Sequence, residues 1–261
     1  MTPALVLAGL GATLALMFLA WALSLALRNT GIVDVFWGLA IAGAGVAWVL
    51  VAPQDAPRGA LAATLAVVWA LRLGGHILWR GWGRPEDRRY REIRARNEPG
   101  FAVKSLYLVF GLQAVLAWLV AFPLYGAAVS TAPLGALDYA GVALWVFGFG
   151  YEAIADAQLA GFQRRGGAER GVMQAGLWRY SRHPNYFFEW LAWCGIATFA
   201  WPAAAAYALA QPIAMFLLVR FVSGVPFTEL QAAKSRGDDY RRYQRETNAF
   251  FPWFPRRGAD A

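Results

Sequence analysis

The chain has 261 residues, of which 59% are hydrophobic and only 15% are charged, whereas about a quarter of the residues in a soluble domain are charged. Its formal net charge is +8, but no base-stacking or groove-reading motif accompanies that charge, which argues against nucleic acid as a partner. The single cysteine, Cys194, excludes an internal disulfide and a cysteine-rich zinc site, and with only two histidines the composition argues against a metal centre.

The first predicted element is an uncharged run from Thr2 to Ala26, which is long enough to cross a hydrocarbon core of roughly 30 Å as a helix. This run lacks a basic n-region and exceeds the usual length of a signal-peptide core, so we predict a retained span. Later apolar segments should also be helices, because backbone polar groups in lipid must be satisfied within the segment. These segments fall at 32–51, 60–79, 104–128, 136–157, 186–200 and 203–222, with a tight turn predicted at Trp201-Pro202 between the last two.

Basic residues are concentrated in three connections, with eight in 80–104, five in 159–185 and seven after residue 222. Because positive residues accumulate in cytoplasmic loops, we place all three connections on the inner side of the membrane. Seven crossings satisfy this placement, whereas fusing the last two segments into one span would put the basic loop and the tail on opposite sides. The sequence therefore predicts a single all-α membrane domain, residues 1–261, of about seven transmembrane helices with the N-terminus outside and the C-terminus cytoplasmic.

Several polar residues lie within the predicted spans, where such side chains are costly and mark candidate functional positions. Glu152 and Asp156 are four residues apart and so share one helix face, and Asn185 and Glu189 have the same spacing. These polar edges on neighbouring helices either bracket a polar ligand entering from the cytoplasm or pair with arginines to hold the bundle together. The other polar residues in the spans are Asp34, Arg72, His76 and Arg220.

The segment 80–104 mixes its eight basic residues with four acidic ones. One interpretation is a solvated loop that orients the protein and touches anionic lipid. The other is a phosphate clamp, because guanidinium groups suit bidentate contacts with phosphate. The position of the segment favours neither interpretation over the other.

The most specific stretch of the chain is Gly176-Leu-Trp-Arg-Tyr-Ser-Arg-His-Pro-Asn-Tyr-Phe-Phe-Glu189. Pro184 predicts the start of a helix, since proline is favoured at the first helical position. A helix N-terminus close to Arg179, Arg182 and His183 is typical of an anion-binding site. Asn185 and Glu189 would then project from the first turns of that helix.

This stretch and several others resemble the membrane steroid 5α-reductase-like superfamily, and in particular its bacterial DUF1295 branch, over nearly the whole chain. The resemblance implies a seven-helix bundle in the bacterial inner membrane, in which NADPH enters from the cytoplasm and a lipophilic unsaturated carbonyl compound enters from the membrane. The other markers are Asp34-Val-Phe-Trp-Gly38, Arg72 with Gly83-Arg-Pro-Glu-Asp-Arg-Arg-Tyr90, Glu152-x3-Asp156-x-Gln-Leu159, Ser223-Gly-Val-Pro226, Tyr240-x2-Tyr243 and Phe251-Pro252.

The resemblance further implies an oxidoreductase acting on a CH–CH group, with a cofactor site built from approximately residues 72–261 on the cytoplasmic side. Carboxylates and amides would bind the ribose hydroxyls and the nicotinamide amide, whereas arginines would bind the pyrophosphate and the 2′-phosphate. The cofactor-binding residues implied are Arg72, Arg84, Glu152, Asp156, Arg179, Arg182, His183, Asn185, Glu189, Tyr240 and Tyr243.

The chain departs from the steroid enzymes at the positions that activate the substrate carbonyl. The second segment has no Gln-Glu pair, and Trp69 stands three residues before Arg72, where a tyrosine is expected. An indole donates a hydrogen bond but is not a practical acid. Asp34, the acidic residue of the second segment, is therefore the candidate catalytic acid, with a structural role such as pairing with Arg28 or capping its helix as the alternative.

Two other functions compete with the reductase. Arg182-His183-Pro184-x-Tyr186 and Glu229 with Tyr240-x2-Tyr243 also resemble the isoprenylcysteine carboxyl methyltransferase family, which implies S-adenosylmethionine as the cofactor. Glu229 is followed by Leu230, however, where that family has a second glutamate. The third possibility is a lipid-binding relative that has kept the fold without the catalysis.

Overall fold

The computed structural model describes residues 3–52, 56–167, 171–222 and 224–256, so Ser223 of the motifs above lies outside the described residues. Every regular element within these ranges is a helix, which confirms the all-α class predicted from the sequence. The chain forms two compact units. The first consists of Met1–Asp138 and Ile196–Ala208, and the second consists of Tyr139–Gly195 and Leu209–Ala261.

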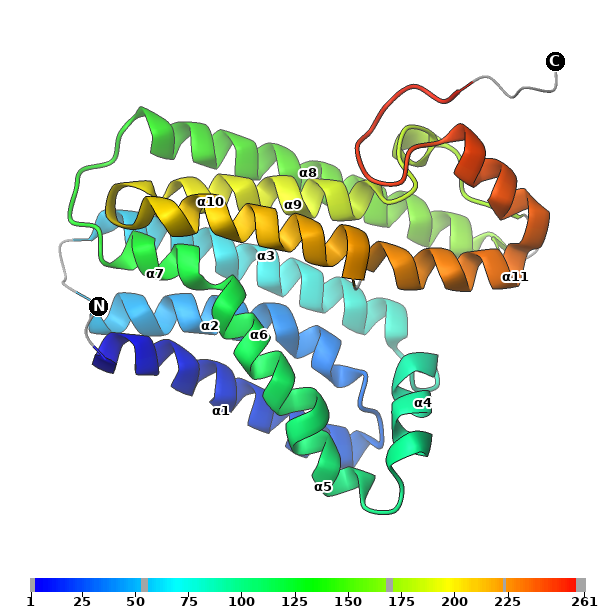
Figure 1. Cartoon of the computed structure of the whole chain (residues 1–261), viewed down its shortest axis with the longest axis horizontal. Coiled ribbons are helices and arrows are strands. Elements are labelled where there is room, and N and C mark those ends of the chain that lie inside the picture. The colour runs from blue at the N-terminus through cyan, green and yellow to red at the C-terminus, as the bar shows by residue number, and fades with distance from the viewer. Residues whose placement is uncertain (1–2, 53–55, 168–170, 223, 257–261) are drawn as a thin grey trace. The chain divides into compact units, whose positions relative to one another are not determined.

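Three long helices and a broken fourth form the first unit (Figure 1). In it, α2 packs between α1 and α3, α6 lies against α1 and α2, and α7 lies against α2 and α3. The segment predicted as one helix over 104–128 is divided at Ala121 and contains a π-helical stretch. The elements are α1 (Pro3–Leu27), α2 (Ile32–Val51), α3 (Pro57–Gly81), α4 (Arg88–Asn97), α5 (Phe101–Ser105), the π-helix Leu106–Gly111, α6 (Leu112–Val120) and α7 (Phe122–Ala128).

Small residues on the buried faces allow these apolar helices to approach one another closely. Trp48 on α2 is fully buried, and its indole nitrogen donates a hydrogen bond to the Leu5 carbonyl of α1 over 2.8 Å. The ring lies over Gly9, where an added Cβ would come within 2.3 Å of it. A residue larger than glycine at position 9 would therefore separate α1 from α2.

Five helical stretches among the described residues are long and apolar enough to cross a membrane, which supports an integral membrane protein. Large hydrophobic side chains on their outer faces are exposed, including Leu7, Phe18 and Leu50. Helices also cover the predicted segments 136–157 and 186–200, but the second of these has only 15 residues. The five stretches are Pro3–Leu27, Ile32–Val51, Pro57–Gly81, Phe101–Val120 and Trp201–Glu246.

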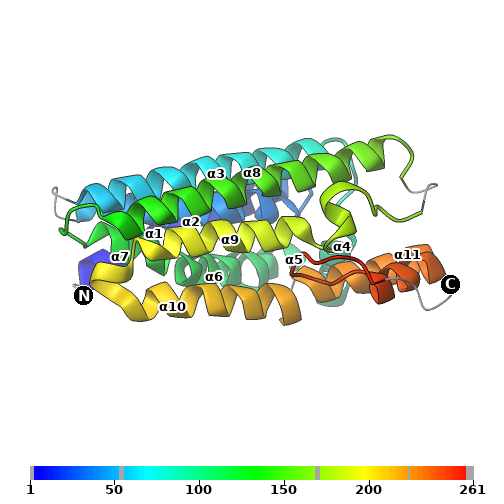
Figure 2. The same cartoon turned by 90° about the horizontal axis from the view of Figure 1, so that it is seen from above.

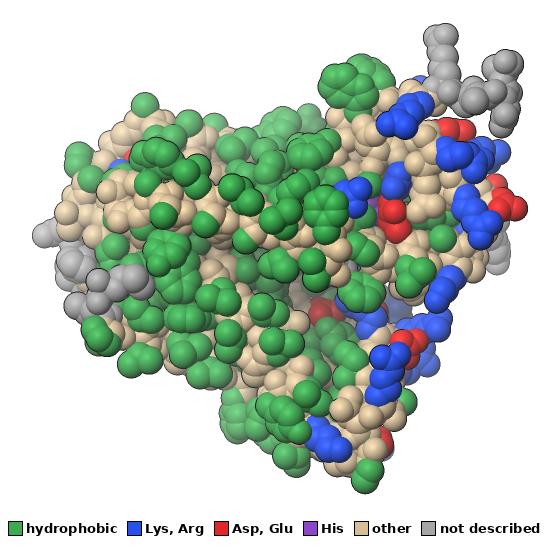
Figure 3. All heavy atoms as spheres, viewed as in Figure 1, with side chains coloured by type: hydrophobic (Ala, Val, Ile, Leu, Met, Phe, Trp, Pro, Cys, Tyr) green, Lys and Arg blue, Asp and Glu red, His purple; other side chains and the backbone are tan. Residues whose placement is uncertain are grey.

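The charged segment 80–104 contains a helix of its own, α4, which apolar periodicity did not predict. Asp87 caps it, since its side chain accepts a hydrogen bond from the Arg89 backbone amide at 2.9 Å. Figure 3 shows charged side chains gathered over α4 in the first unit and over α11 (Gly224–Glu246) in the second, whereas hydrophobic side chains cover the apolar helices. The basic segment is thus ordered structure, not an irregular loop.

A buried ion pair fastens the opposite end of α3. Arg58 donates through Nε to Asp138 at 2.7 Å, and both side chains are 3% exposed. The same guanidinium also donates to the Ser130 hydroxyl and to the carbonyls of Ala132 and Pro133. Because these partners satisfy its donors, the pair holds the connection between α7 and α8 against the start of α3.

The second unit contains most of α8 (Ala136–Arg164), α9 (Pro184–Thr198), the end of α10 (Trp201–Leu217) and α11 (Gly224–Glu246). Figure 1 and Figure 2 both show α8 and α9 side by side. Close approach requires glycine, since an added Cβ at Gly148 would lie 2.5 Å from the Ala192 backbone nitrogen. Gly195 likewise approaches the Gly141 carbonyl, which shows that the two helices run antiparallel. The predicted turn at Trp201-Pro202 was two positions late, because the turn lies at Phe199-Ala200 and Trp201 begins α10.

Candidate functional site

The antiparallel register of α8 and α9 brings the predicted acidic and amide residues of these helices together. The Asn185 side-chain nitrogen donates to an Asp156 carboxylate oxygen over 3.2 Å. One turn away, Glu152 on α8 and Glu189 on α9 extend the same polar layer between the helices. Glu152 and Asp156 are 2% and 8% exposed, so their carboxylates lie inside an otherwise apolar helix pair.

The stretch before α9 is fixed to α8 by two hydrogen bonds. The Trp178 indole nitrogen donates to the Ala155 carbonyl at 3.0 Å, and the Leu177 backbone amide donates to the Gln158 side chain at 3.0 Å. Gly176 has a φ of +61°, and an added Cβ there would meet the Gln158 amide at 2.5 Å. Glycine at this position therefore allows the 3-10 turn Gly176–Arg179 to pack on α8.

The C-terminal segment after α11 runs alongside this stretch and holds it from the other side. The backbone amide of Arg182 donates to the Asn248 carbonyl at 2.9 Å, and the Ser181 hydroxyl donates to the Phe250 carbonyl at 2.8 Å. The Trp253 amide donates to the Tyr180 carbonyl at 2.8 Å. Residues 180–183 are consequently fixed on both sides before α9 begins.

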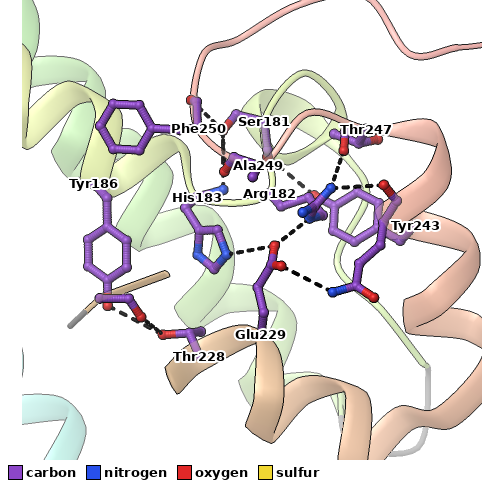
Figure 4. Close-up of polar contacts among 12 residues, drawn as sticks. Ser181, Arg182, His183, Tyr186, Thr228, Glu229, Tyr243, Thr247, Ala249 and Phe250 are labelled. Atoms are coloured by element: carbon purple, nitrogen blue, oxygen red, sulfur yellow. Dashed lines mark hydrogen bonds and ion pairs between the residues drawn. The ribbon is translucent and has the colours of Figure 1, made fainter. Parts of the chain in front are cut away.

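Glu229 of α11 is the centre of a charged cluster at the start of α9 (Figure 4). Its carboxylate accepts from Arg182 Nε at 2.6 Å, lies 3.3 Å from His183 Nε2, and accepts from the Gln244 amide at 3.1 Å. Arg182 also donates to the carbonyls of Gln244 and Thr247. Two of the three groups that the sequence placed near an anion site, Arg182 and His183, thus already have a carboxylate partner within the chain.

Burial lowers the pKa of the His183 imidazole, although the Glu229 carboxylate acts in the opposite direction. The ring is 2% exposed and stacks on Tyr186, with the ring centroids 5.6 Å apart. At neutral pH the imidazole of His183 is therefore neutral, and its Nε2–H donates to the Glu229 carboxylate.

The remaining predicted residues of the second unit differ in exposure. The Tyr243 hydroxyl donates to the Trp178 and Ser181 carbonyls, so it holds the turn before α9 against α11. Tyr240 is buried beside it, with the two rings edge-to-face at 5.9 Å. Arg179 is exposed to solvent, so its guanidinium is accessible to a ligand.

The first unit contains the other three predicted residues. Asp34 near the start of α2 accepts a hydrogen bond from the Tyr90 hydroxyl at 2.5 Å and pairs with Arg89 at 3.2 Å. The ion-pair partner of Asp34 is therefore Arg89 on α4, not Arg28. Asp34 does not cap its helix either, since the N-cap of α2 is Gly31. Arg84 is exposed in the connection between α3 and α4, and Arg72 is half-buried on α3.

Two residues central to these clusters were not among the predicted site residues. Glu229 lies 47 positions from Arg182, and only the resemblance to the methyltransferases drew attention to it. Tyr90 belongs to a quoted motif, but nothing in its spacing connects it to Asp34, which is 56 positions away. Burial and the nearby Asp34 carboxylate raise the pKa of Tyr90, so its hydroxyl keeps its proton at neutral pH.

A family model described as "Protein of unknown function (DUF1295)" matches residues 20–247. The chain belongs to the DUF1295 family. This match confirms the DUF1295 family predicted from the sequence and runs from the last turns of α1 to the end of α11. The chain is also similar to an uncharacterized protein of Schizosaccharomyces pombe, with 24% identity over 258 residues that cover 89% of this chain and 75% of the yeast protein. No solved structure gives a significant match to this DUF1295 protein.

Proposed function

We propose that this DUF1295 protein is an NADPH-dependent membrane reductase that transfers hydride to a lipophilic unsaturated carbonyl compound. The observation that carries the proposal is the buried polar layer between α8 and α9, where Asn185 meets Asp156 and the same faces contain Glu152 and Glu189. Placing carboxylates inside an apolar helix pair is costly, which makes such positions functional candidates.

The chemistry of this layer fits the polar groups of a dinucleotide. The Asn185 side-chain oxygen is buried and accepts no hydrogen bond from the residues that the structure describes. It therefore offers an acceptor for a ligand N–H or O–H group, and the acidic residues of the layer offer further acceptors. Ribose hydroxyls and a nicotinamide carboxamide supply such donors, so we assign these functions to Glu152, Asp156, Asn185 and Glu189.

Phosphate binding is assigned to arginines whose side chains are accessible. Arg179 and Arg84 are exposed, and we add the half-buried Arg72. Arg182 is engaged by Glu229 and by two backbone carbonyls, so we assign it a supporting role in holding the start of α9. His183, Tyr240 and Tyr243 support the same region from α11 and the preceding turn.

NADPH supplies the hydride when it is bound, and the protein must supply a hydrogen-bond donor or a proton for the substrate carbonyl. We assign this function to Asp34 acting through Tyr90, because the two side chains share a 2.5 Å hydrogen bond. The Tyr90 hydroxyl has a single proton, which it donates to Asp34. On substrate binding the hydroxyl would turn from the carboxylate and donate that proton to the substrate carbonyl. This pair would replace the tyrosine of the steroid enzymes, whose expected position is occupied by the buried Trp69.

The proposal includes the topology and the wider relationship inferred from the sequence. Seven crossings with the N-terminus outside place the charged α4 segment, the start of α9 and the whole of α11 on the cytoplasmic side. The steroid 5α-reductase-like superfamily and the bacterial inner membrane belong to the same proposal. A cofactor made in the cytoplasm would then reach the polar layer from water, and a lipophilic substrate would reach it from the bilayer.

Ligand-induced thermal stabilisation of the detergent-purified protein tests the proposal. A ligand present at about 100 times its Kd stabilises the folded state by about 2.7 kcal/mol, which raises Tm by several degrees for a chain of this length. We expect NADPH to raise Tm in the wild type and in the exposed control Gln174→Ala. The rise should be reduced in Asn185→Ala and in Glu189→Ala.

A methyltransferase that uses S-adenosylmethionine is the second candidate function, and one observation favours it. The two sequence elements that resemble that family meet in the structure, since Glu229 contacts both Arg182 and His183. The same thermal assay separates the candidates. Stabilisation by S-adenosylmethionine without any effect of NADPH would replace the reductase with the methyltransferase, and a response to neither would favour a non-catalytic lipid-binding protein.

A further inference from the structure

A cavity of about 410 Å³ lies in the first unit where α1 ends against α4 and α5. Its volume is within the ~300–1,000 Å³ typical of small-molecule sites. None of its lining residues belongs to the proposed cofactor or catalytic set. The side chains that define its chemistry are those of Ser24, Arg28, Thr30, Arg94, Phe101 and Ser105.

Two guanidinium groups give this cavity a positive lining. Arg94 donates to Glu86 at 2.9 Å and to the Thr30 hydroxyl at 3.2 Å, and it stacks over the Phe101 ring at 4.7 Å. Burial alone would raise the pKa of Glu86, but hydrogen bonds from Arg94 and Thr30 lower it below its ordinary value. Glu86 is therefore ionised, and its negative charge offsets the positive charge of Arg94. Arg28 is exposed and makes no ion pair with the described residues, so its guanidinium is accessible to a ligand in the cavity.

The backbone at Arg28 gives a second, independent indication of function. Its φ of +50° lies in the left-handed region, which is the conformation that usually selects glycine just after a helix. A non-glycine residue there is strained, because its Cβ crowds the following carbonyl oxygen. An arginine at a position better suited to glycine indicates that its side chain is needed, since local strain of this kind concentrates at functional sites.

The location of the cavity indicates which anion it would bind. Arg28 is the first charged residue of the sequence, and only Leu27 separates it from the uncharged run Thr2–Ala26. Leu25 and Phe101 provide apolar walls beside the arginines. A ligand here would therefore have its anionic group at the polar end of α1 and apolar atoms against the membrane-facing helix surface.

We propose that this cavity binds the headgroup of an anionic phospholipid, with the phosphate between Arg28 and Arg94 and the acyl chains along α1. Guanidinium groups suit phosphate oxygens, and basic pockets at the membrane surface select anionic headgroups by charge. The proposal is independent of the reductase assignment, because it uses none of the same residues. Hydroxyl groups of the headgroup would face Ser24, Thr30 and Ser105.

The test measures lipid binding by native mass spectrometry and thermal stabilisation of the whole protein in a neutral detergent. Phosphatidylglycerol and phosphatidylcholine are titrated separately against the wild type, Arg28→Gly, Arg28→Lys and the control Arg96→Gln, whose arginine is exposed on α4 outside the cavity. Inorganic phosphate is titrated as a third ligand. Arg28→Gly relieves the left-handed strain, so without lipid it should be at least as stable as the wild type.

We expect phosphatidylglycerol to bind the wild type and Arg96→Gln in preference to phosphatidylcholine. Arg28→Gly should weaken phosphatidylglycerol binding by roughly tenfold or more, because it removes a charge-assisted contact, and Arg28→Lys should recover part of the loss. Equal phosphatidylglycerol affinity in Arg28→Gly and the wild type would overturn the proposal. Inorganic phosphate that stabilises as strongly as the lipid, through Arg28, would overturn the assignment to a lipid headgroup.

Discussion

Each unit contains a cluster in which arginine, a carboxylate and an aromatic side chain meet, and the two clusters differ in burial. In the first unit, the pair of Arg89 and Asp34 is 52% and 35% exposed. In the second, the pair of Arg182 and Glu229 is 9% and 17% exposed. Exposed ion pairs contribute little to stability and exchange partners readily, whereas a buried pair cannot lose one partner without a large penalty.

This difference in exposure is the reason to assign different functions to the two arginine–carboxylate pairs. In the cluster around Asp34, the carboxylate and Arg89 have the accessibility that a catalytic group needs, and the Tyr90 ring is buried beside them. The cluster around Glu229 fixes the start of α9, and so fixes the position of Asn185, the second residue of that helix. We therefore assign chemistry to the accessible cluster and positioning to the buried one, and the predictions below test that division.

The largest expected effect is on stability. Arg182→Ala removes the partner of Glu229 and of two backbone carbonyls, which should cost roughly 3–5 kcal/mol. Arg89→Ala, the corresponding change in the exposed cluster, should cost less than about 1 kcal/mol. Thermal unfolding of both variants in the same detergent measures the contrast, and equal losses of Tm would refute the division into a fixed and an accessible cluster.

The next effect is on turnover. Asp34→Asn and Tyr90→Phe should lower NADPH oxidation in the presence of membrane lipid extract by about 10²-fold or more, since general acid catalysis contributes about 10²–10⁴-fold. Both variants should bind NADPH as the wild type does. Tyr139→Phe, a change at an exposed tyrosine, is the matched control. Wild-type oxidation rates in Tyr90→Phe would remove that residue from the mechanism.

A smaller effect concerns recognition of the 2′-phosphate. NADH should bind about tenfold less tightly than NADPH, because it lacks a group that contributes charge-assisted hydrogen bonds. Arg84→Gln should reduce this preference, while Arg91→Gln, an exposed arginine on α4, should retain it. If NADPH and NADH bind the wild type equally, the chain has no site for the 2′-phosphate.

The smallest predicted effect is the pH dependence of stability that arises from His183. Burial lowers its pKa in the folded state below the ordinary value of about 6.5. As pH falls below 6.5 the unfolded state therefore binds a proton that the folded state does not, and stability decreases by at most about 1.4 kcal/mol per pH unit. The charged groups acting on it are Glu229, Arg182 and Arg220.

Tm measured between pH 7.5 and 5 should fall more steeply in the wild type than in His183→Gln. If Tm depends on pH equally steeply in His183→Gln and in the wild type, groups other than His183 cause the pH dependence. Because the imidazole contacts Glu229 at 3.3 Å, this measurement also reports on the buried cluster without removing its central carboxylate.

The sequence predicted most helix positions because long apolar runs end at charged residues, glycine or proline. It did not predict α4, since that helix has no apolar periodicity and depends on capping by Asp87 and on contacts with Asp34. It also left the charged tail after residue 222 unassigned, although Gly224–Glu246 is helical. Hydropathy does not predict helices such as these, because polar contacts and not apolar faces stabilise them.

The candidate site was predicted in part. The four-residue spacing correctly placed Glu152 with Asp156 and Asn185 with Glu189 on shared helix faces, and the structure brings Asp156 and Asn185 into contact. The pairing of Arg182 with Glu229 was not predictable, because it depends on how the segment after α9 folds back. Local periodicity determines faces, whereas contacts between residues distant in sequence depend on the tertiary packing.

Equilibrium binding of NADPH to the purified protein in lipid nanodiscs tests the central claim most directly. We predict saturable binding that is at least tenfold weaker in Asn185→Ala and unchanged in Gln174→Ala, because only the first variant removes the buried amide from the layer between α8 and α9. An Asn185→Ala protein that binds NADPH as tightly as the wild type, or a wild type that binds none, would contradict the account.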